Sequence, residues 1–118
     1  MGIKPLLPSL REKKRYVAFE IISSKSVSSF TEVLKSFWQG FCSLLGELEL
    51  ARAGIILIKN TYNSQTQRGL VRVNNKYVDH VKAAFTMINN IEQQPVIVRS
   101  LGVSGVLNKA QKKYVGGY

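Results

Sequence analysis

The sequence predicts an α+β fold in which six elements follow one another in the order β-α-β-β-α-β. Three observations predict it. Apolar residues alternate or cluster in four short segments, they recur at three- and four-residue steps in two longer ones, and Gly, Pro, Asn or Ser separate the segments. The length of 118 residues fits one domain. This order is the split βαβ plan of ferredoxin-like folds, an antiparallel four-stranded sheet with both helices on one face.

The first strand is predicted over residues 15–22, which are rich in β-branched and aromatic residues. Because side chains alternate along a strand, Val17 and its apolar neighbours face the helices, and Glu20 faces the opposite side. A helix follows over about residues 27–48, where apolar residues recur with helical spacing. Gly46 either ends this helix or interrupts it.

A hairpin is predicted next. Residues 55–59 form a near-continuous apolar strand, residues 60–66 a polar loop, and residues 69–74 an alternating strand. The short connection favours antiparallel pairing of the two strands.

The remaining segments complete the fold. A second helix is predicted from Asn74 or Asn75 to about Asn90, and a last strand over residues 96–101. Residues 102–105 read as a turn, and residues 107–114 as a short helix. We therefore expect a flexible basic arm at 1–14, one α/β domain at 15–105 and a basic C-terminal tail at 106–118.

The first strand of this plan lies between the third and the fourth, so Glu20 should sit between Arg72 and Arg99 on a sheet face that no helix covers. Two interpretations stay open. The cluster is either a set of solvated ion pairs or an arginine pair that Glu20 holds for a phosphate or a partner carboxylate.

The charge is strongly basic, with 17 Lys and Arg against 7 Asp and Glu and a formal net charge of +10. Such an excess favours a polyanion, either nucleic acid or an anionic membrane surface, although a merely solvated basic surface gives the same count. Residues 16–51 stand apart, with four glutamates and two lysines. No apolar run is long enough to span a membrane, so we expect no membrane partner.

Catalytic and metal-binding chemistry is not expected on this chain. His80, Cys42 and Asp79 are each the single residue of their type, and no paired carboxylates or phosphate-binding glycine loop occur. One cysteine forms no internal disulfide, which favours a reducing compartment, and we expect a cytoplasmic location.

The first helix carries more apolar residues than one sheet needs to cover it. It is either a well-buried helix or one that reserves a second surface for a protein partner, with self-association as an alternative. The candidate protein-interface residues are Phe37, Trp38 and Phe41.

RNA-recognition-motif proteins share this element order and stack bases on aromatic residues of the third strand. The corresponding run here, residues 68–74 (RGLVRVN), has no Phe or Tyr at those positions. Contact between basic side chains and the phosphates of a structured RNA fits better.

Three segments together carry a family resemblance: KKRYVAFE at 13–20, RGLVRVNNKYVDHVKAAF at 68–85, and VIVRSLGVSG at 96–105 followed by Lys109 and Ala110. They resemble archaeal ribonuclease P protein component 2, the archaeal relative of the eukaryotic Pop-five subunit. The resemblance covers residues 13 to about 113. It implies a subunit of the ribonucleoprotein endonuclease that removes the 5′ leader of precursor tRNA, in an RNA-recognition-like fold.

The resemblance also implies partners and a division of labour. The RNA subunit would bind Mg²⁺ and catalyse hydrolysis, and this chain would carry no cofactor. The chain would bind ribonuclease P RNA together with ribonuclease P protein component 3 and meet precursor tRNA indirectly. A homodimer within a heterotetramer is a further expected arrangement. A ferredoxin-like protein–protein adaptor in another ribonucleoprotein is the alternative.

Basic side chains near the matching segments are the candidate RNA contacts, because each Lys or Arg that replaces a counterion should lower the Mg²⁺ needed for activity. They are Lys13, Lys14, Arg15, Arg68, Arg72, Lys76, Arg99, Lys112 and Lys113.

Overall fold

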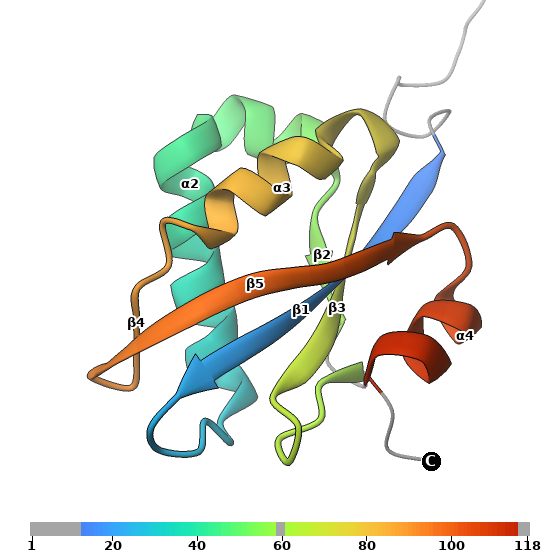
Figure 1. The fold of residues 1–118 in the computed structure, drawn as a ribbon. Helices are drawn as coiled ribbons and strands as arrows, with labels where there is room; N and C mark the ends of the chain where they lie inside the picture. The colour runs from blue at the N-terminus through green and yellow to red at the C-terminus, as the bar shows by residue number, and fades with distance from the viewer. Residues whose placement is uncertain (1–12, 59–60, 116–118) are drawn as a thin grey trace, which may run out of the picture.

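The computed structural model describes residues 13–58 and 61–115, and these residues form an antiparallel sheet with helices on both faces (Figure 1). The predicted α+β class is confirmed, but the sheet has five strands, in the order β2-β3-β1-β5-β4. The elements are β1 (Lys14–Ser23), α2 (Phe30–Ala53), β2 (Ile56–Leu57), β3 (Arg68–Asn74), η2 (Asn75–Tyr77), α3 (Val78–Phe85), β4 (Asn90–Ile91), β5 (Gln94–Ser104), α4 (Leu107–Ala110) and η3 (Gln111–Val115).

The central strand β1 lies between β3 and β5, as predicted. Its pairing with β5 shifts between Ala18 and Phe19, whose partners are Gly102 and Ser100, so Leu101 is the extra residue of a bulge. The bulge places both Val98 and Val103 on the helix side. The strand therefore continues to Ser104, and the predicted turn at 102–105 is wrong.

The first helix extends past its predicted end. Ser29 caps its start by accepting a hydrogen bond from the Glu32 amide, and α2 runs to Ala53. Gly46 interrupts it with φ 76° and ψ 167°, a conformation outside the helical region. The helix ends at Gly54, which is left-handed at φ 61°, so this glycine and not Gly46 is the terminal cap.

Two other boundaries differ from prediction. The strand predicted over 55–59 is regular only at Ile56–Leu57, after which the Ile58 amide still donates to the Leu70 carbonyl of β3. Residues 59–60 lie outside the described part. The second helix, predicted to reach Asn90, ends at Phe85 because a short hairpin of β4 and β5 follows. Glu92 and Gln93, both at positive φ, form the turn of that hairpin, without the Gly or Asn that such turns prefer.

The main core lies between the sheet and the helices α2 and α3. Phe19 of β1 packs edge-on against Phe37 with ring centroids 4.8 Å apart, and Phe41 and Phe85 complete the aromatic cluster. Each of these four rings is at most 1% exposed. The buried rings fix α2 and α3 against one face of the sheet.

A second, smaller core lies on the opposite face, where α4 and η3 form the predicted C-terminal helix (Figure 1). Ala110 and Val115 pack on Ala18 and Leu70 of the central strands. Tyr114 fits only because residue 102 is glycine, since a Cβ there would lie 2.2 Å from its hydroxyl oxygen. The prediction of a sheet face without any helix is therefore wrong, because Ala18 and Gly102 are small and leave room for the C-terminal helix.

The ends of the predicted domain plan are only partly visible. Most of the arm predicted at 1–14 and the last residues of the tail predicted at 106–118 lie outside the described residues. Within the described ranges, no helix combines the length and apolar character needed to cross a lipid bilayer.

Candidate functional site

Glu20 stands in the middle of a row of three charged residues across the face that carries the C-terminal helix. Its carboxylate accepts hydrogen bonds from Arg68 Nε at 3.0 Å and from Arg99 Nε at 2.8 Å. A second nitrogen of Arg99 lies 2.7 Å from the same carboxylate. The predicted partner Arg72 is wrong, because the β1–β3 register pairs Glu20 with Arg68 and Tyr16 with Arg72.

The electrostatics of Glu20 follow from these contacts. Burial of its side chain raises the pKa of the carboxyl, but the hydrogen bonds and positive charges of Arg68 and Arg99 outweigh burial and hold the pKa below its ordinary value. The carboxylate is thus ionised at neutral pH and cancels part of the charge of both arginines. Arg99 remains the more open of the two, with 57% of its side chain exposed against 36% for Arg68.

Arg72 lies further along β3, on the same face, in a different setting. Its register neighbours are Tyr16 on β1 and Ile56 on β2, and neither is acidic. Its Nε atom is buried, and the described residues offer that atom no hydrogen-bond partner. The residue as a whole is partly exposed, so an acceptor outside the chain can reach the rest of the guanidinium but not this atom.

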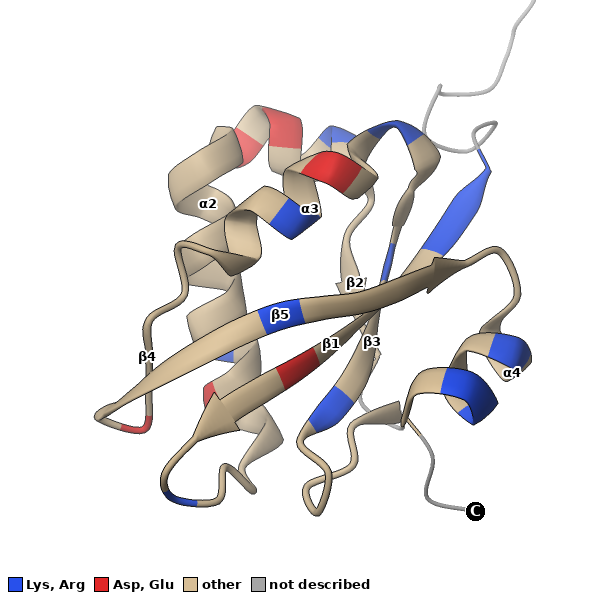
Figure 2. Ribbon diagram, viewed as in Figure 1, with Lys and Arg blue, Asp and Glu red and all other residues tan. Residues whose placement is uncertain are grey.

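Other predicted RNA contacts gather where β1 begins and β3 ends (Figure 2). The Asn75 amide donates to the Lys13 carbonyl at 2.8 Å, and the Lys14 ammonium donates to the Asn74 side chain. Arg15 lies next to them on β1, and Lys76 follows on η2. The start of β1 and the start of η2 thus bring four cations to one end of the sheet.

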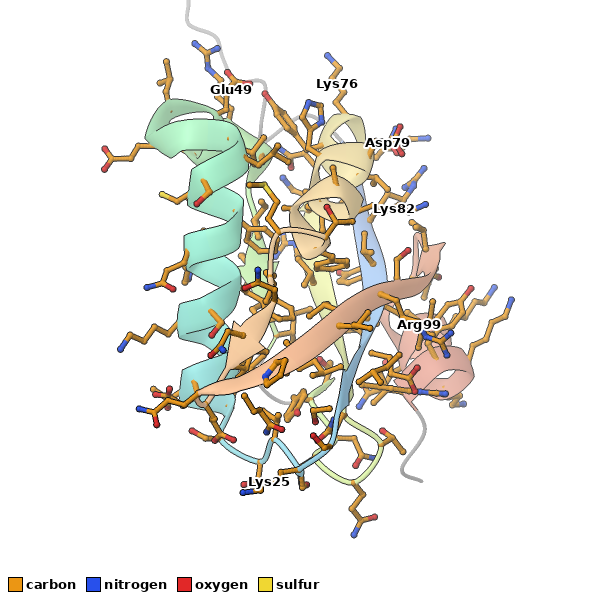
Figure 3. All side chains as sticks on the ribbon, turned by 60° about the vertical axis from the view of Figure 1, so that its left-hand side comes forward. Lys25, Glu49, Lys76, Asp79, Lys82 and Arg99 are labelled. Carbon is orange, nitrogen blue, oxygen red and sulfur yellow. The ribbon has the colours of Figure 1, made fainter. Side chains whose placement is uncertain are left out.

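Lys82 on α3 joins this end of the molecule and was not among the predicted contacts. Figure 3 shows Lys76 and Lys82 extending from η2 and α3 into solvent, with the carboxylate of Asp79 between them. Both lysines are exposed. The sequence could have indicated Lys82. It lies three residues after Asp79 on α3, so both side chains share a face of the helix, away from the buried apolar residues.

The C-terminal helix presents a second basic group. Lys112 and Lys113, both predicted contacts, are exposed there, and so is Lys109, whose spacing the sequence shows. The Lys113 ammonium lies 5.4 Å from the centroid of the Tyr114 ring. Arg68 donates to the Tyr114 carbonyl at 3.2 Å, so the helix is tied to the row of charges beside it.

The predicted protein interface divides between core and surface. Phe37 and Phe41 belong to the aromatic core, each 1% exposed, whereas Trp38 is 37% exposed. Trp38 is therefore the member of this set whose side chain can contact a partner without unfolding the helix. The helical periodicity of the sequence placed these three residues on one broad apolar stripe. It did not distinguish the buried side of that stripe, with Phe37 and Phe41, from the exposed side, with Trp38.

Catalytic groups do not converge in the described part of the chain. No three of its His, Cys, Asp and Glu residues are placed to hold a metal ion. The ring of His80 lies 5.1 Å from that of Tyr77, centroid to centroid, on the surface of α3. What the site offers chemically is an array of cations on a rigid sheet.

Comparison with known proteins places the chain in a family. The model of the Rpp14/Pop5 family matches residues 15–115, which is most of the chain. The chain belongs to the Rpp14/Pop5 family.

Three relatives match this chain along all or nearly all of its length. "Ribonuclease P protein component 2" of Pyrococcus abyssi is 38% identical over 118 residues, covering 100% of this chain and 98% of the relative. The protein of the same name in Thermococcus kodakarensis is 38% identical, with 98% and 93% covered. That of Methanosarcina mazei is 30% identical, with 96% and 93% covered.

A solved structure shares the fold. A chain in the cryo-EM structure of yeast ribonuclease MRP superposes with a TM-score of 0.51 at 12% identity, covering 86% of this chain and 84% of that one. At that identity the likeness concerns the fold alone.

Proposed function

We propose that this protein is a subunit of ribonuclease P that binds the catalytic RNA and supports removal of the 5′ leader from precursor tRNA. The observation that carries the proposal is the match to archaeal proteins named ribonuclease P protein component 2, which covers nearly the full length of this chain and of each relative. The exposed cations of the sheet end and the C-terminal helix support it, because phosphate contact needs such groups.

The chain acts as an electrostatic support in this proposal, and the chemistry belongs to the RNA. Folded RNA brings phosphates close together, and Lys and Arg side chains neutralise them in fixed positions. Mg²⁺ is held by the RNA, and the chain carries no cofactor of its own. The protein works in the cytoplasm and pairs with ribonuclease P protein component 3, and a homodimer within a heterotetramer is a further part of the proposal.

Binding to ribonuclease P RNA at several salt concentrations tests the proposal. Each phosphate contact contributes roughly 0.7–0.9 to the slope of log affinity against log salt, so a contact surface of several cations gives a steep negative slope. Reconstituted cleavage of precursor tRNA, measured against Mg²⁺ concentration, supplies the functional half. Addition of this chain should lower the Mg²⁺ concentration that gives half-maximal cleavage.

Two results contradict the proposal. A salt slope near zero favours the protein–protein adaptor, in which the basic surface meets an acidic protein. Cleavage of precursor tRNA by the purified chain without the RNA subunit overturns the assignment of the chemistry to the RNA.

A further inference from the structure

An apolar groove opens beside the break in α2. Its volume is about 430 Å³. The residues that line it come from three places: Trp38 before the break, Glu47, Leu50 and Ala51 after it, and Gly54, Ile55 and Ile56 leading into β2. The break at Gly46 creates the groove, because the last turns of α2 no longer continue the line of the first part of the helix.

The groove is unusually apolar for a surface feature. Trp38 is 37% exposed and Ile56 49% exposed, and Leu48, on the same stretch of α2, is 66% exposed. Isolated exposed apolar residues are common, but several together around a hollow indicate a contact surface.

Charge narrows the choice of occupant. Helix α2 carries Glu32, Glu47 and Glu49 against Lys35 and Arg52, whereas the rest of the described chain is strongly basic (Figure 2). Arg52 is already paired with Glu49 at 3.1 Å, so Glu47 is the carboxylate left on the groove wall. RNA does not fit here, because an apolar wall with a carboxylate repels phosphate.

A second copy of this chain fits poorly as well. In a two-fold symmetric contact both copies use the same patch, so one interface would hold two Glu47 carboxylates and no cation from either groove wall. An apolar segment with Lys or Arg beside it satisfies both the wall and the carboxylate.

We propose that this groove is the docking site for an apolar, basic-flanked segment of the protein partner. The inference rests on the proposed function, in which that partner is component 3. It assigns the contact to the α2–β2 edge and leaves the cations of the sheet end and the C-terminal helix for RNA. Protein and RNA then bind through different side chains.

The single tryptophan gives a direct probe. When the chain is labelled with 5-fluorotryptophan, Trp38 alone gives a ¹⁹F resonance. Titration with purified component 3 should shift that resonance and saturate. Ile56→Lys, which places a charge on the groove wall, should weaken the affinity at least tenfold. Ile97→Lys is the matched control, because Ile97 is also an exposed strand isoleucine, 63% exposed, but lies on β5.

The possible outcomes separate the two proposals. If component 3 does not bind at all, the pairing in the proposed function fails. If component 3 binds but the Trp38 resonance stays in place, or Ile56→Lys binds as well as Ile97→Lys, the groove inference fails alone. Thermal unfolding of both variants guards against a folding defect.

Two further results would also overturn the groove inference. One is a Trp38 resonance in the free chain that shifts when residues 1–12 are deleted, because the chain would then fill its own groove. The other is a loss of dimer mass by light scattering on Ile56→Lys, which would make a second copy the occupant.

Discussion

Arg68 on β3 donates a hydrogen bond from Nη1 to the main-chain carbonyl of Tyr114, 3.2 Å away, and so joins the sheet to the C-terminal helix. The Nε of the same arginine donates to Glu20. One side chain thus links the row of charges on the sheet to the helix that carries Lys112 and Lys113. We therefore expect the position of those lysines to depend on Glu20, although Glu20 does not touch them.

Replacement of Glu20 tests this link through pH. The arginines hold the pKa of Glu20 below its ordinary value, so its contribution to stability is present above about pH 4.5 and is lost as the pH falls through the lowered pKa. Glu20→Gln should lower the free energy of unfolding by about 1 kcal/mol at pH 7, because both arginines are partly exposed. Urea unfolding measured between pH 2.5 and 7 checks the size and direction of the loss.

The control compares the acid part of the two curves. Glu20→Gln should lose less stability than the unchanged chain as the pH falls below 4.5, since the titrating carboxyl is gone. Parallel curves for the two proteins would contradict the ion-pair account of Glu20.

Gly102→Ala tests how the C-terminal helix packs on the sheet. A Cβ at residue 102 would meet the Tyr114 ring, with its hydroxyl oxygen 2.2 Å away, so the ring must move. Overpacking of this kind costs about 1–3 kcal/mol, and proteolysis near residue 110 should become faster. Gly105→Ala is the matched control, because its new Cβ lies 3.4 Å from Arg15 Nη1, an ordinary contact. Equal proteolysis rates for the two variants would contradict the packing of Tyr114 against Gly102.

The raised pKa of the Tyr62 hydroxyl leads us to expect a loss of stability at high pH. Burial raises the pKa of its hydroxyl to about 12, with a smaller contribution from Glu92, and the hydroxyl donates to the Val27 carbonyl at 2.6 Å. Because the folded pKa is raised, this stability is complete below about pH 10 and is lost as the pH rises toward 12. Tyr62→Phe should cost about 1 kcal/mol at pH 7 and flatten the stability curve above pH 10. Denaturant unfolding at pH 7, 10 and 11.5 measures both effects, and an unchanged alkaline slope would contradict them.

The turn between β4 and β5 offers a stabilising change. Glu92 and Gln93 have φ of 56° and 63°, which residues with a side chain adopt at a cost. Glu92→Asn with Gln93→Gly supplies the pair that such two-residue turns prefer and should stabilise the chain by about 1 kcal/mol. The melting temperature measures the gain, and Glu92→Ala with Gln93→Ala, which keeps the backbone cost, should show none.

The sequence predicted the element order and the buried faces because those depend on periodicity within one segment. Val17, Phe19 and Phe85 lie in the main core where alternation and helical spacing placed them. The β4–β5 hairpin was missed because Glu92 and Gln93 are not turn-forming types, so its stability comes from pairing and not from local preference.

Features that depend on register between segments could not be read from the sequence. We predicted Arg72 beside Glu20, but the register places Arg68 there, four residues earlier on β3. A shift by an even number of residues keeps the same side chains on the same face, so the alternation of apolar and polar residues does not reveal it. The groove at Trp38 needs the break at Gly46 and the nearby β2 edge together. A stripe of apolar residues on one helix contains no information about that edge.

Arg72 and Arg68 should differ in their contribution to RNA binding. Arg68 is hydrogen-bonded to Glu20 and to Tyr114. Arg72 is partly exposed, and its register neighbours Tyr16 and Ile56 carry no acidic group. A phosphate can therefore bind Arg72 without breaking an ion pair, but must compete with Glu20 for Arg68. Arg72→Gln should lower the affinity for ribonuclease P RNA by about 1–2 kcal/mol and reduce the salt slope by roughly 0.7–0.9. Arg68→Gln should leave the salt slope nearly unchanged, and filter binding from 50 to 400 mM salt distinguishes the two. A larger slope change for Arg68→Gln than for Arg72→Gln would mean that the RNA displaces Glu20, and the row of charges would then be the RNA contact.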